Sequence, residues 1–273
     1  MEIRDTPPCK RVGPAHYRDG VTDPTRGVLY PDRLPRFTRL APSAAASEFV
    51  AWFWIPQWDL PDGVVSRQPI LGYPAANLAV EPGGVTLWGA TTVASERALQ
   101  GSGWAVGALL KPAAFSRLHG APGDLVDAHV ALDEPELQRT VAAAMPDIAA
   151  ASTVVSAWLA ERVGPPTAEA RLANAMADLL MEDAAIVRLD DAAERLRVSV
   201  RTLQRLAHRT VGVSPAAMIR RRRLQEAAQR VREDPNAPLA DIAADLGYAD
   251  QAHLANDFRA VLGLTASDYR AAR

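Results

Sequence analysis

Residues 189–206 read LDDAAERLRVSVRTLQRL, and residues 239–258 read LADIAADLGYADQAHLANDF. In both stretches a short periodic segment has an alanine at its centre, Ala193 or Ala243, and ends at a leucine. A tight connection follows, and then a polar residue that suits a helix N-cap, Ser199 or Asp250. A small central alanine lets two helices approach closely, as a helix-turn-helix requires. The repeated pattern therefore predicts two helix-turn-helix units in the C-terminal part of the chain.

The second helix of the first unit is predicted to have two different faces. Its apolar stripe consists of Leu203 and Leu206, with Val200 beside them. Its opposite face carries polar side chains at i, i+3, i+4 and i+7, namely Arg201, Gln204, Arg205 and His208. Arginine and glutamine can pair bidentately with guanine and adenine edges in the major groove. An ordinary solvated helix face is the alternative interpretation.

A basic segment joins the two units. Residues 216–231 have a usable apolar face, so we expect one linking helix there. From Arg195 to Arg232 the chain has eleven arginines and one acidic residue, Glu226. These positive charges repel one another, and neutralisation of nucleic-acid phosphates would offset the repulsion. The alternative is a mixture of structural ion pairs and solvated side chains, and of the run 220–223 we expect Arg223 to be structural.

Residues 190–270 resemble the DNA-binding domain of AraC/XylS-type transcriptional regulators. The matching stretches are 199–206, 212–215, 223–224, 227–228, 242–243, 247–254, 258–259, 263–266 and 269–270. The resemblance implies recognition helices at 200–209 and 251–260, which the linking helix places in successive major grooves. It implies that the base-facing side chains are Arg201, Gln204 and Arg205 in the first unit, and Gln251, His253 and Asn256 in the second.

The complete set of candidate DNA-contacting residues covers both units and the linking helix. It consists of Ser199, Arg201, Thr202, Gln204, Arg205, His208, Arg209, Arg220, Arg221, Asp250, Gln251, His253, Asn256 and Arg259. Three positions depart from the family pattern. Asn256 stands where arginine or lysine is frequent, Ala266 where proline is common, and Ala207 where a large aromatic residue is common. Because of Asn256, we expect the second unit to contact DNA more weakly than the first, whereas the two alanines should soften local packing without changing the fold.

The preceding half of the chain has a different pattern. Short strands are predicted at 49–55, 77–80, 85–88 and 104–110, with a hairpin signal at Glu81-Pro82-Gly83-Gly84. Helices are predicted at 113–118, 135–145 and 148–163, and Gly164-Pro165-Pro166 interrupts the helical pattern. In outline this half resembles the small-barrel sensor domains that precede such DNA-binding domains. Five tryptophans concentrate here: Trp52, Trp54, Trp58, Trp88 and Trp104. We expect at least one of them to line a pocket or an interface. The alternative is that they form a plain aromatic core.

The predicted fold class is thus an α+β N-terminal domain, a small β-barrel or sandwich of sensor type with helices, followed by an all-α double helix-turn-helix domain. The predicted divisions are a poorly ordered segment at 1–28, the sensor-like or oligomerisation domain at 29–163, a linker at 164–167 and the DNA-binding domain at 168–273. The charge follows this division. Residues 1–187 carry 15 basic and 21 acidic residues, whereas residues 188–273 carry 15 and 11. An acidic N-terminal part and a basic C-terminal part indicate that only one end of the chain meets a polyanion.

Several classes of protein are disfavoured. A single cysteine, Cys9, excludes an internal disulfide and a multi-thiolate zinc site. His16, His119 and His129 are scattered, which disfavours a metalloenzyme. We expect no metal, no cofactor and no enzymatic activity. The weakly polar stretch 141–160 contains Pro146 and Asp147 and does not look like a membrane span. With no secretion signal in the N-terminal sequence, we expect a cytoplasmic protein.

The function that the sequence predicts is sequence-specific DNA binding by a transcriptional regulator. Its expected partner is double-stranded DNA, and the other candidate partners are RNA polymerase, a small-molecule effector and a second copy of the chain. Two alternatives stay open. One is a DNA-repair or DNA-modifying enzyme with a similar DNA-binding domain, for which Cys9 is the candidate reactive residue. The other is a constitutive regulator whose N-terminal half binds only protein.

Overall fold

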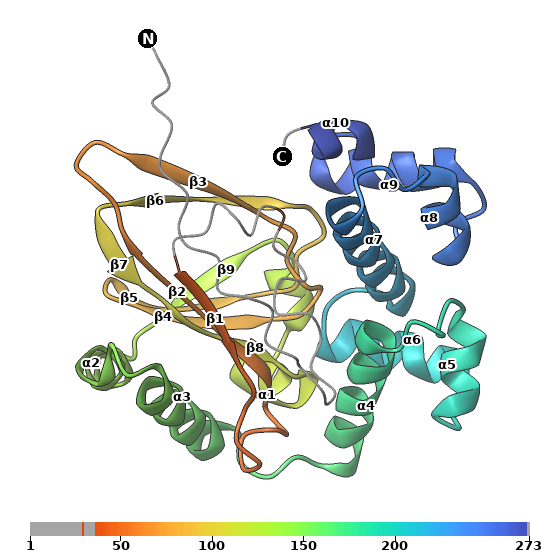
Figure 1. Ribbon diagram of the computed structural model, residues 1–273. Helices are drawn as coiled ribbons and strands as arrows, with labels where there is room; N and C mark the ends of the chain where they lie inside the picture. The colour runs from red at the N-terminus through yellow and green to blue at the C-terminus, as the bar shows by residue number, and fades with distance from the viewer. Residues whose placement is uncertain (1–28, 30–35, 272–273) are drawn as a thin grey trace.

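An open antiparallel sheet forms the N-terminal part of the computed structural model, which describes residues 29 and 36–271 (Figure 1). The strands are β1 (Arg36–Leu40), β2 (Val50–Asp59), β3 (Val65–Ile70), β4 (Asn77–Glu81), β5 (Gly84–Trp88), β6 (Ser95–Gln100), β7 (Ser102–Trp104), β8 (Val106–Leu110) and β9 (His129–Leu132). The seven-stranded sheet has the order β1-β2-β8-β4-β5-β9, with β7 paired to β2. β3 and β6 form a second sheet of two strands. The predicted strand-rich architecture of the N-terminal part is confirmed, and its main sheet is open rather than closed into a barrel.

The predicted hairpin joins β4 to β5. Val80 lies opposite Val85, and Glu81 lies opposite Gly84, so Pro82 and Gly83 form the tip. Gly84 has a φ of 140°, in the region that favours glycine. The predicted strand 104–110 is divided into β7 and β8, which pair with different parts of β2.

Helices cover one face of the sheet. They are α1 (Pro112–Leu118), the 3₁₀ turn η2 (Pro122–Leu125), α2 (Pro135–Ala144) and α3 (Ile148–Val163). The helix α3 starts at Asp147, whose carboxylate accepts hydrogen bonds from the backbone N–H of Ala149 and Ala150, both at 3.0 Å. Buried side chains at four-residue spacing along α3, such as Val155 and Leu159, join the sheet residues in one apolar core. Burial of this stripe fixes α3 on the sheet.

The C-terminal part is helical throughout. Its elements are α4 (Ala168–Glu182), α5 (Leu189–Arg195), α6 (Val200–Thr210), α7 (Pro215–Glu233), α8 (Leu239–Asp245), α9 (Gln251–Leu262) and α10 (Ala266–Ala271). The pairs α5–α6 and α8–α9 are the two predicted helix-turn-helix units, and α7 is the linking helix that runs between them (Figure 1). The all-α double helix-turn-helix architecture is therefore confirmed. Each unit has its own apolar core.

The two parts of the chain share buried contacts. The Asn174 carboxamide in α4 accepts a hydrogen bond from the Ala113 N–H at 2.9 Å and donates one to the Glu48 carbonyl at 2.8 Å. Leu71, which follows β3, is fully buried in the core of the second helix-turn-helix unit. The Tyr269 hydroxyl donates to the Leu29 carbonyl at 2.5 Å. Although α3 ends before the predicted linker at 164–167, the division into two domains therefore stays a prediction, and the segment 1–28 lies outside the described residues.

Two features are absent from the described residues. None of the helices within 36–271 combines the length and the apolar character that crossing a membrane needs. In the same part of the chain, no cluster of three or more histidine, cysteine, aspartate or glutamate side chains has an arrangement that could hold a metal ion.

Candidate nucleic-acid interface

The first helix-turn-helix unit is built as its sequence predicts. In the turn between α5 and α6, the Val198 N–H donates to the Ala193 carbonyl at 3.0 Å. Ser199 caps α6, because its hydroxyl accepts a hydrogen bond from the Thr202 N–H at 3.1 Å. The Ser199 and Thr202 hydroxyls also lie 2.8 Å apart. Both predicted DNA-contacting hydroxyls therefore take part in the helix cap.

The outward face of α6 is exposed. Leu203, Leu206 and Ala207 are buried beneath it. The predicted reading residues Arg201, Gln204, Arg205 and His208 are all exposed, and they border a shallow hollow that Leu189, Ser214, Pro215 and Ala216 complete. Within the described part of the chain, no hydrogen bond or ion pair engages the side chains of Arg201, Gln204 and Arg205. This face is therefore available to a ligand that offers hydrogen-bond acceptors and negative charge.

Arg209, a further predicted contact, lies near the end of α6 and has a protein partner. Its guanidinium forms an ion pair with Glu169 in α4, and both side chains are more than half exposed. Exposed pairs of this kind contribute little to stability and exchange readily for other partners. Arg209 thus lies near the exposed face of α6, but the Glu169 carboxylate competes with any other ligand for its guanidinium.

The second unit repeats the turn geometry of the first. The Tyr248 N–H donates to the Ala243 carbonyl at 2.9 Å, and the Asp250 carboxylate caps α9 by accepting from the His253 N–H at 2.7 Å. The predicted contacts on α9 are exposed: Gln251, His253, Asn256 and Arg259. Two of them interact with each other, since the Arg259 guanidinium donates to the Asn256 carboxamide at 3.4 Å. The face of α9 therefore carries one arginine, whereas the exposed face of α6 carries three.

The four consecutive arginines of α7 point in four directions, as successive positions of a helix must. Arg220 pairs with Asp257 in α9, with its Nε and an Nη atom 2.9 and 2.6 Å from Asp257 Oδ1. The Arg220 side chain is 51% exposed, whereas Asp257 is nearly fully buried. Hydrogen bonding to Asp257 raises the pKa of Arg220. Arg220 thus holds α9 against the linking helix α7.

Arg221 does not lie on the predicted interface. It is 4% exposed and donates to the Thr91 carbonyl at 3.1 Å, in the loop after β5. Burial lowers the pKa of Arg221 to about 10, although Asp127 opposes this shift. A guanidinium enclosed against the N-terminal part cannot reach a phosphate in this arrangement. The prediction of a DNA contact failed here because neighbouring positions of the arginine run face different parts of the fold.

Arg222 and Arg223 complete the set. Arg222 is fully buried and donates to the Ile186 carbonyl at 2.6 Å, in the loop between α4 and α5. The half-buried Arg223 lies with its guanidinium carbon 3.9 Å from the centre of the Tyr248 ring, a cation–π contact. Burial raises the pKa of Tyr248, and the negative charge of Asp257 adds to the shift. Arg223 is structural, as predicted, but Arg222 is more deeply buried.

Sequence reasoning missed Asp257 as a functional residue. The sequence places this acidic residue on the apolar side of its helix, because Asp257 lies three positions after the buried Leu254 and next to the buried Phe258. An acidic residue on the apolar side of a helix needs a buried cation or a set of donors. The arginine run of α7 supplies that cation.

Comparisons with known proteins agree with this architecture. Residues 192–272 match the model of a helix-turn-helix domain family, and residues 38–131 match the model of a domain of unknown function. An AraC-like transcription regulator of Streptomyces lividans is 36% identical over 116 residues, which are 42% of this chain and 36% of the relative. The transcriptional activator AarP of Providencia stuartii is 37% identical over 82 residues, 30% of this chain and 60% of AarP. The chain thus spans about a third of the Streptomyces relative that it matches and three fifths of AarP.

Two solved structures are similar at lower identity. The C-terminal domain of AraT, a response regulator from Geobacillus stearothermophilus, is 24% identical with a TM-score of 0.34, over 37% of this chain and 84% of that one. ToxT from Vibrio cholerae is 13% identical with a TM-score of 0.42, over 80% of this chain and 96% of that one. TM-scores this low carry no argument about function. The C-terminal part of the chain matches a helix-turn-helix domain family, and the chain is similar over part of its length to AraC-like transcription regulators.

Proposed function

We propose that the protein is a sequence-specific DNA-binding transcriptional regulator that inserts α6 and α9 into successive major grooves of one duplex. The exposed face of α6 carries the proposal. Arg201, Gln204 and Arg205 lie on it side by side, and no protein group within the described residues engages them. These side chain types read guanine and adenine edges directly. The relatives of similar sequence are transcription regulators by name, which supports the same function.

The other predicted contacts have secondary roles in this proposal. Gln251, His253 and Asn256 read the second groove, and Arg259 adds a phosphate contact. Ser199, Thr202 and Asp250 lie at helix N-termini, where backbone N–H groups favour phosphate. His208 and Arg209 extend the first face, and Arg220 contributes its exposed edge while it holds Asp257.

The family also bears on the alternatives. Regulators of this type are normally not enzymes, and the candidate reactive residue of a DNA-modifying enzyme, Cys9, lies outside the described residues. RNA polymerase and a second copy of the chain are further proposed partners. A DNA target places the protein in the cytoplasm with the chromosome.

Binding of the full-length protein to random-sequence duplexes, followed by footprinting of the selected site, tests the proposal. We expect two protected patches about 10–10.5 base pairs apart in a non-palindromic site. If about four to six phosphates are neutralised, the slope of log affinity against log salt should lie between about −3.6 and −5.4. A single protected patch, or a site that must be an inverted repeat, would contradict a two-groove monomer.

A matched pair of variants identifies the reading face. The double variant Arg201→Ala/Arg205→Ala should lose selected-site binding and keep much of its weak binding to random DNA. Arg67→Ala should bind normally, because that arginine lies on β3, paired with Glu96. Equal losses on selected and random DNA would reduce the α6 arginines to phosphate contacts.

A further inference from the structure

The helices α6 and α9 can be compared position by position, because each starts at a side-chain cap. The Ser199 hydroxyl accepts a hydrogen bond from the N–H three residues later, and so does the Asp250 carboxylate. Counted from these caps, the fourth, seventh and eighth residues are buried in both helices, and the second, sixth and ninth are exposed. Residues at the same distance from the cap therefore occupy the same place on the two helices.

The side chains at the equivalent outer places differ in chemistry. The corresponding pairs are Arg201 and Ala252, Gln204 and Ala255, Arg205 and Asn256, and His208 and Arg259. All three of the first places on α6 carry groups that form hydrogen bonds with a base edge, whereas two of the three on α9 carry only a methyl group. The two helices therefore present different groups to the bases of a groove.

The face of α6 offers two guanidinium groups close together. Arg201 and Arg205 are exposed, and neither has a hydrogen bond or an ion pair with the described part of the chain. Arginine pairs bidentately with O6 and N7 of guanine, which is the commonest specific contact in the major groove. Four residues of helix span about 6 Å along the axis, the height of roughly two base pairs. The face of α6 thus favours two guanines within a few base pairs.

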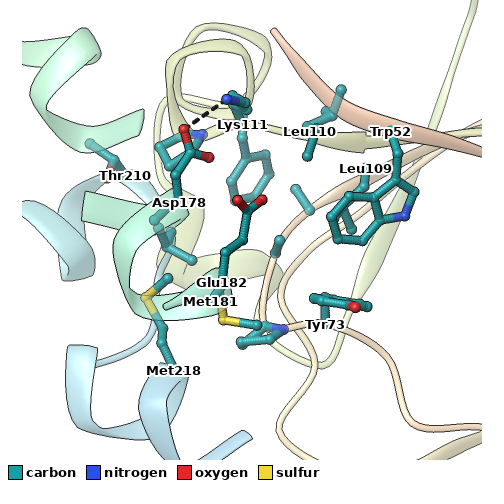
Figure 2. Close-up of a pocket in the computed structure, with 18 residues that line it drawn as sticks. Trp52, Tyr73, Leu109, Leu110, Lys111, Asp178, Met181, Glu182, Thr210 and Met218 are labelled. Carbon is teal, nitrogen blue, oxygen red and sulfur yellow. Dashed lines mark hydrogen bonds and ion pairs between the residues drawn. The ribbon is translucent and has the colours of Figure 1, made fainter. Parts of the chain in front are cut away.

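Packing against the N-terminal part holds α6 in place. The Lys111 ammonium, after β8, lies 2.8 Å from the Asp178 carboxylate in α4, and α4 packs against α6. Thr210, at the end of α6, is buried and lines a pocket of about 40 Å³ between the sheet and the helices, with room for only a few water molecules (Figure 2). A bidentate contact requires a guanidinium at a fixed distance and angle from the base, which a firmly packed helix provides.

The face of α9 has a more apolar surface. Ala252 is exposed and Ala255 is partly exposed, and both lie within one helical turn of the exposed Asn256. Alanine can contact the C5-methyl group of thymine, and asparagine can pair with adenine. Arg259, further along the same face, donates to the Asn256 carboxamide at 3.4 Å. The face of α9 thus favours A·T base pairs over guanine.

We propose that the DNA site has two patches of different composition. In the first patch Arg201 and Arg205 of α6 read two guanines, and in the second Ala252, Ala255 and Asn256 of α9 read A·T base pairs. Ala252 is the specificity-determining residue of the second unit, because a methyl group stands there in the place of an arginine of α6. This inference rests on the proposed function and adds the bases that each helix reads.

Base analogues in the selected duplex test the proposal, because each removes one contacting group and keeps the base pairing. 7-Deazaguanine lacks the N7 acceptor of guanine, and uracil lacks the methyl group of thymine. In the first patch, 7-deazaguanine should weaken binding of the full-length protein by about fivefold to twentyfold. At any guanine of the second patch it should change binding by less than about twofold. Uracil there should weaken binding by about twofold to fourfold, as for one methyl group.

Protein variants assign these responses to residues. The residual binding of Arg201→Ala/Arg205→Ala should no longer respond to 7-deazaguanine in the first patch. The control Arg67→Ala, which changes an exposed arginine of β3, should keep the full response. A repeated selection with Ala252→Arg should introduce a guanine into the second patch and leave the first patch unchanged.

Three outcomes would overturn the proposal. They are equal responses of the two patches to 7-deazaguanine, a response that survives the double arginine substitution, and an Ala252→Arg selection in which the second patch is unchanged. Each of them requires a selected site with two patches. Failure to select any site would instead contradict the proposed function, so the two failures are distinguishable.

Discussion

The two helix-turn-helix units have the same turn but are attached to the rest of the protein in different ways. In each, the residue that follows the turn donates its N–H to the central alanine of the first helix, Val198 to Ala193 and Tyr248 to Ala243. The first unit packs against the N-terminal part, and a Cβ atom at Gly212, just after α6, would lie 2.8 Å from the Pro122 carbonyl oxygen. The second unit is held to α7 by the Arg220–Asp257 ion pair and the Arg223–Tyr248 cation–π contact, and it meets the N-terminal part where Leu71 enters its core.

The difference separates reading from positioning. The exposed face of α6 carries three arginines, and its buried face needs only apolar packing to fix the helix. α9 has one exposed arginine, and its buried face contains Asp257, which is bound to Arg220. A helix that must be fixed by a buried carboxylate has fewer positions left for contacting a ligand. We therefore expect the first unit to supply most of the base discrimination and the second to set the register.

The largest expected effect concerns the attachment of the first unit. Arg222→Met removes the hydrogen bond to the Ile186 carbonyl and the cation 3.9 Å from Glu226, all in a buried setting. Loss of a buried charged hydrogen bond should lower the free energy of unfolding by roughly 2–4 kcal/mol, as urea denaturation would measure. Arg188→Met is the control, because that side chain is 75% exposed and should cost less than about 0.5 kcal/mol. Equal stability of the two variants would show that Arg222 does not anchor this unit.

The comparison of the two reading faces gives the next effect. Arg205→Ala should weaken binding to the selected site by roughly 1–3 kcal/mol, because a bidentate base contact is lost. Asn256→Ala should cost under about 1 kcal/mol, since its carboxamide already accepts from Arg259. Competition titrations against selected and random duplexes measure both. A larger loss at Asn256 than at Arg205 would reverse the assignment of the two units.

Much of this arrangement could be predicted from sequence because it is local. The caps Ser199 and Asp250, the buried leucines of α6 and the Glu81–Gly84 hairpin all depend on residues within a few positions of one another. The exposed side chains of α6 could be predicted for the same reason, because helical periodicity alone separates them from the stripe. Whether they contact DNA stays a prediction.

The missed features depend on distant partners. Arg220, Arg221 and Arg222 bind groups that lie 37, 130 and 36 positions away in the sequence. Periodicity gives the direction of each side chain from the helix axis but not the element that it meets. The strands β3 and β6 were missed for another reason: most of their residues are exposed, so they lack the alternation that marks a strand.

Removal of one partner of the Arg220–Asp257 pair between α7 and α9 should lower stability by a smaller amount, which depends on the partner that is removed. Arg220→Ala leaves the buried Asp257 carboxylate without its cation, which should cost roughly 1–2 kcal/mol of stability. Asp257→Asn leaves a half-exposed guanidinium that water can solvate, so its cost should be under about 1 kcal/mol. Thermal unfolding of both variants measures the asymmetry. The reverse order would mean that Arg220 contributes little to burying Asp257 and is mainly a surface cation.

The smallest effect lies in the turns themselves, where the two units place different residues in the same conformation. Arg197 has a φ of 54°, and Gly247, at the equivalent position, has a φ of 72°. Gly247→Ala should destabilise the protein by about 1 kcal/mol, because this region disfavours side chains. The new Cβ would also lie 3.3 Å from Val187 Cγ1.

The reciprocal substitution, Arg197→Gly, should have the opposite sign. It relieves roughly 1 kcal/mol of left-handed strain. Most of that gain is offset by the greater entropy that glycine loses on folding, about 0.5–1 kcal/mol, so a rise of a few tenths is expected. Thermal unfolding with and without the selected duplex measures both the stability and any change in DNA affinity. If Arg197→Gly instead lowers stability by more than about 0.5 kcal/mol, the Arg197 side chain stabilises the first turn through contacts worth more than the strain. If it lowers only DNA affinity, Arg197 joins the phosphate contacts of the first unit, and the two turns differ in function as well as in residue type.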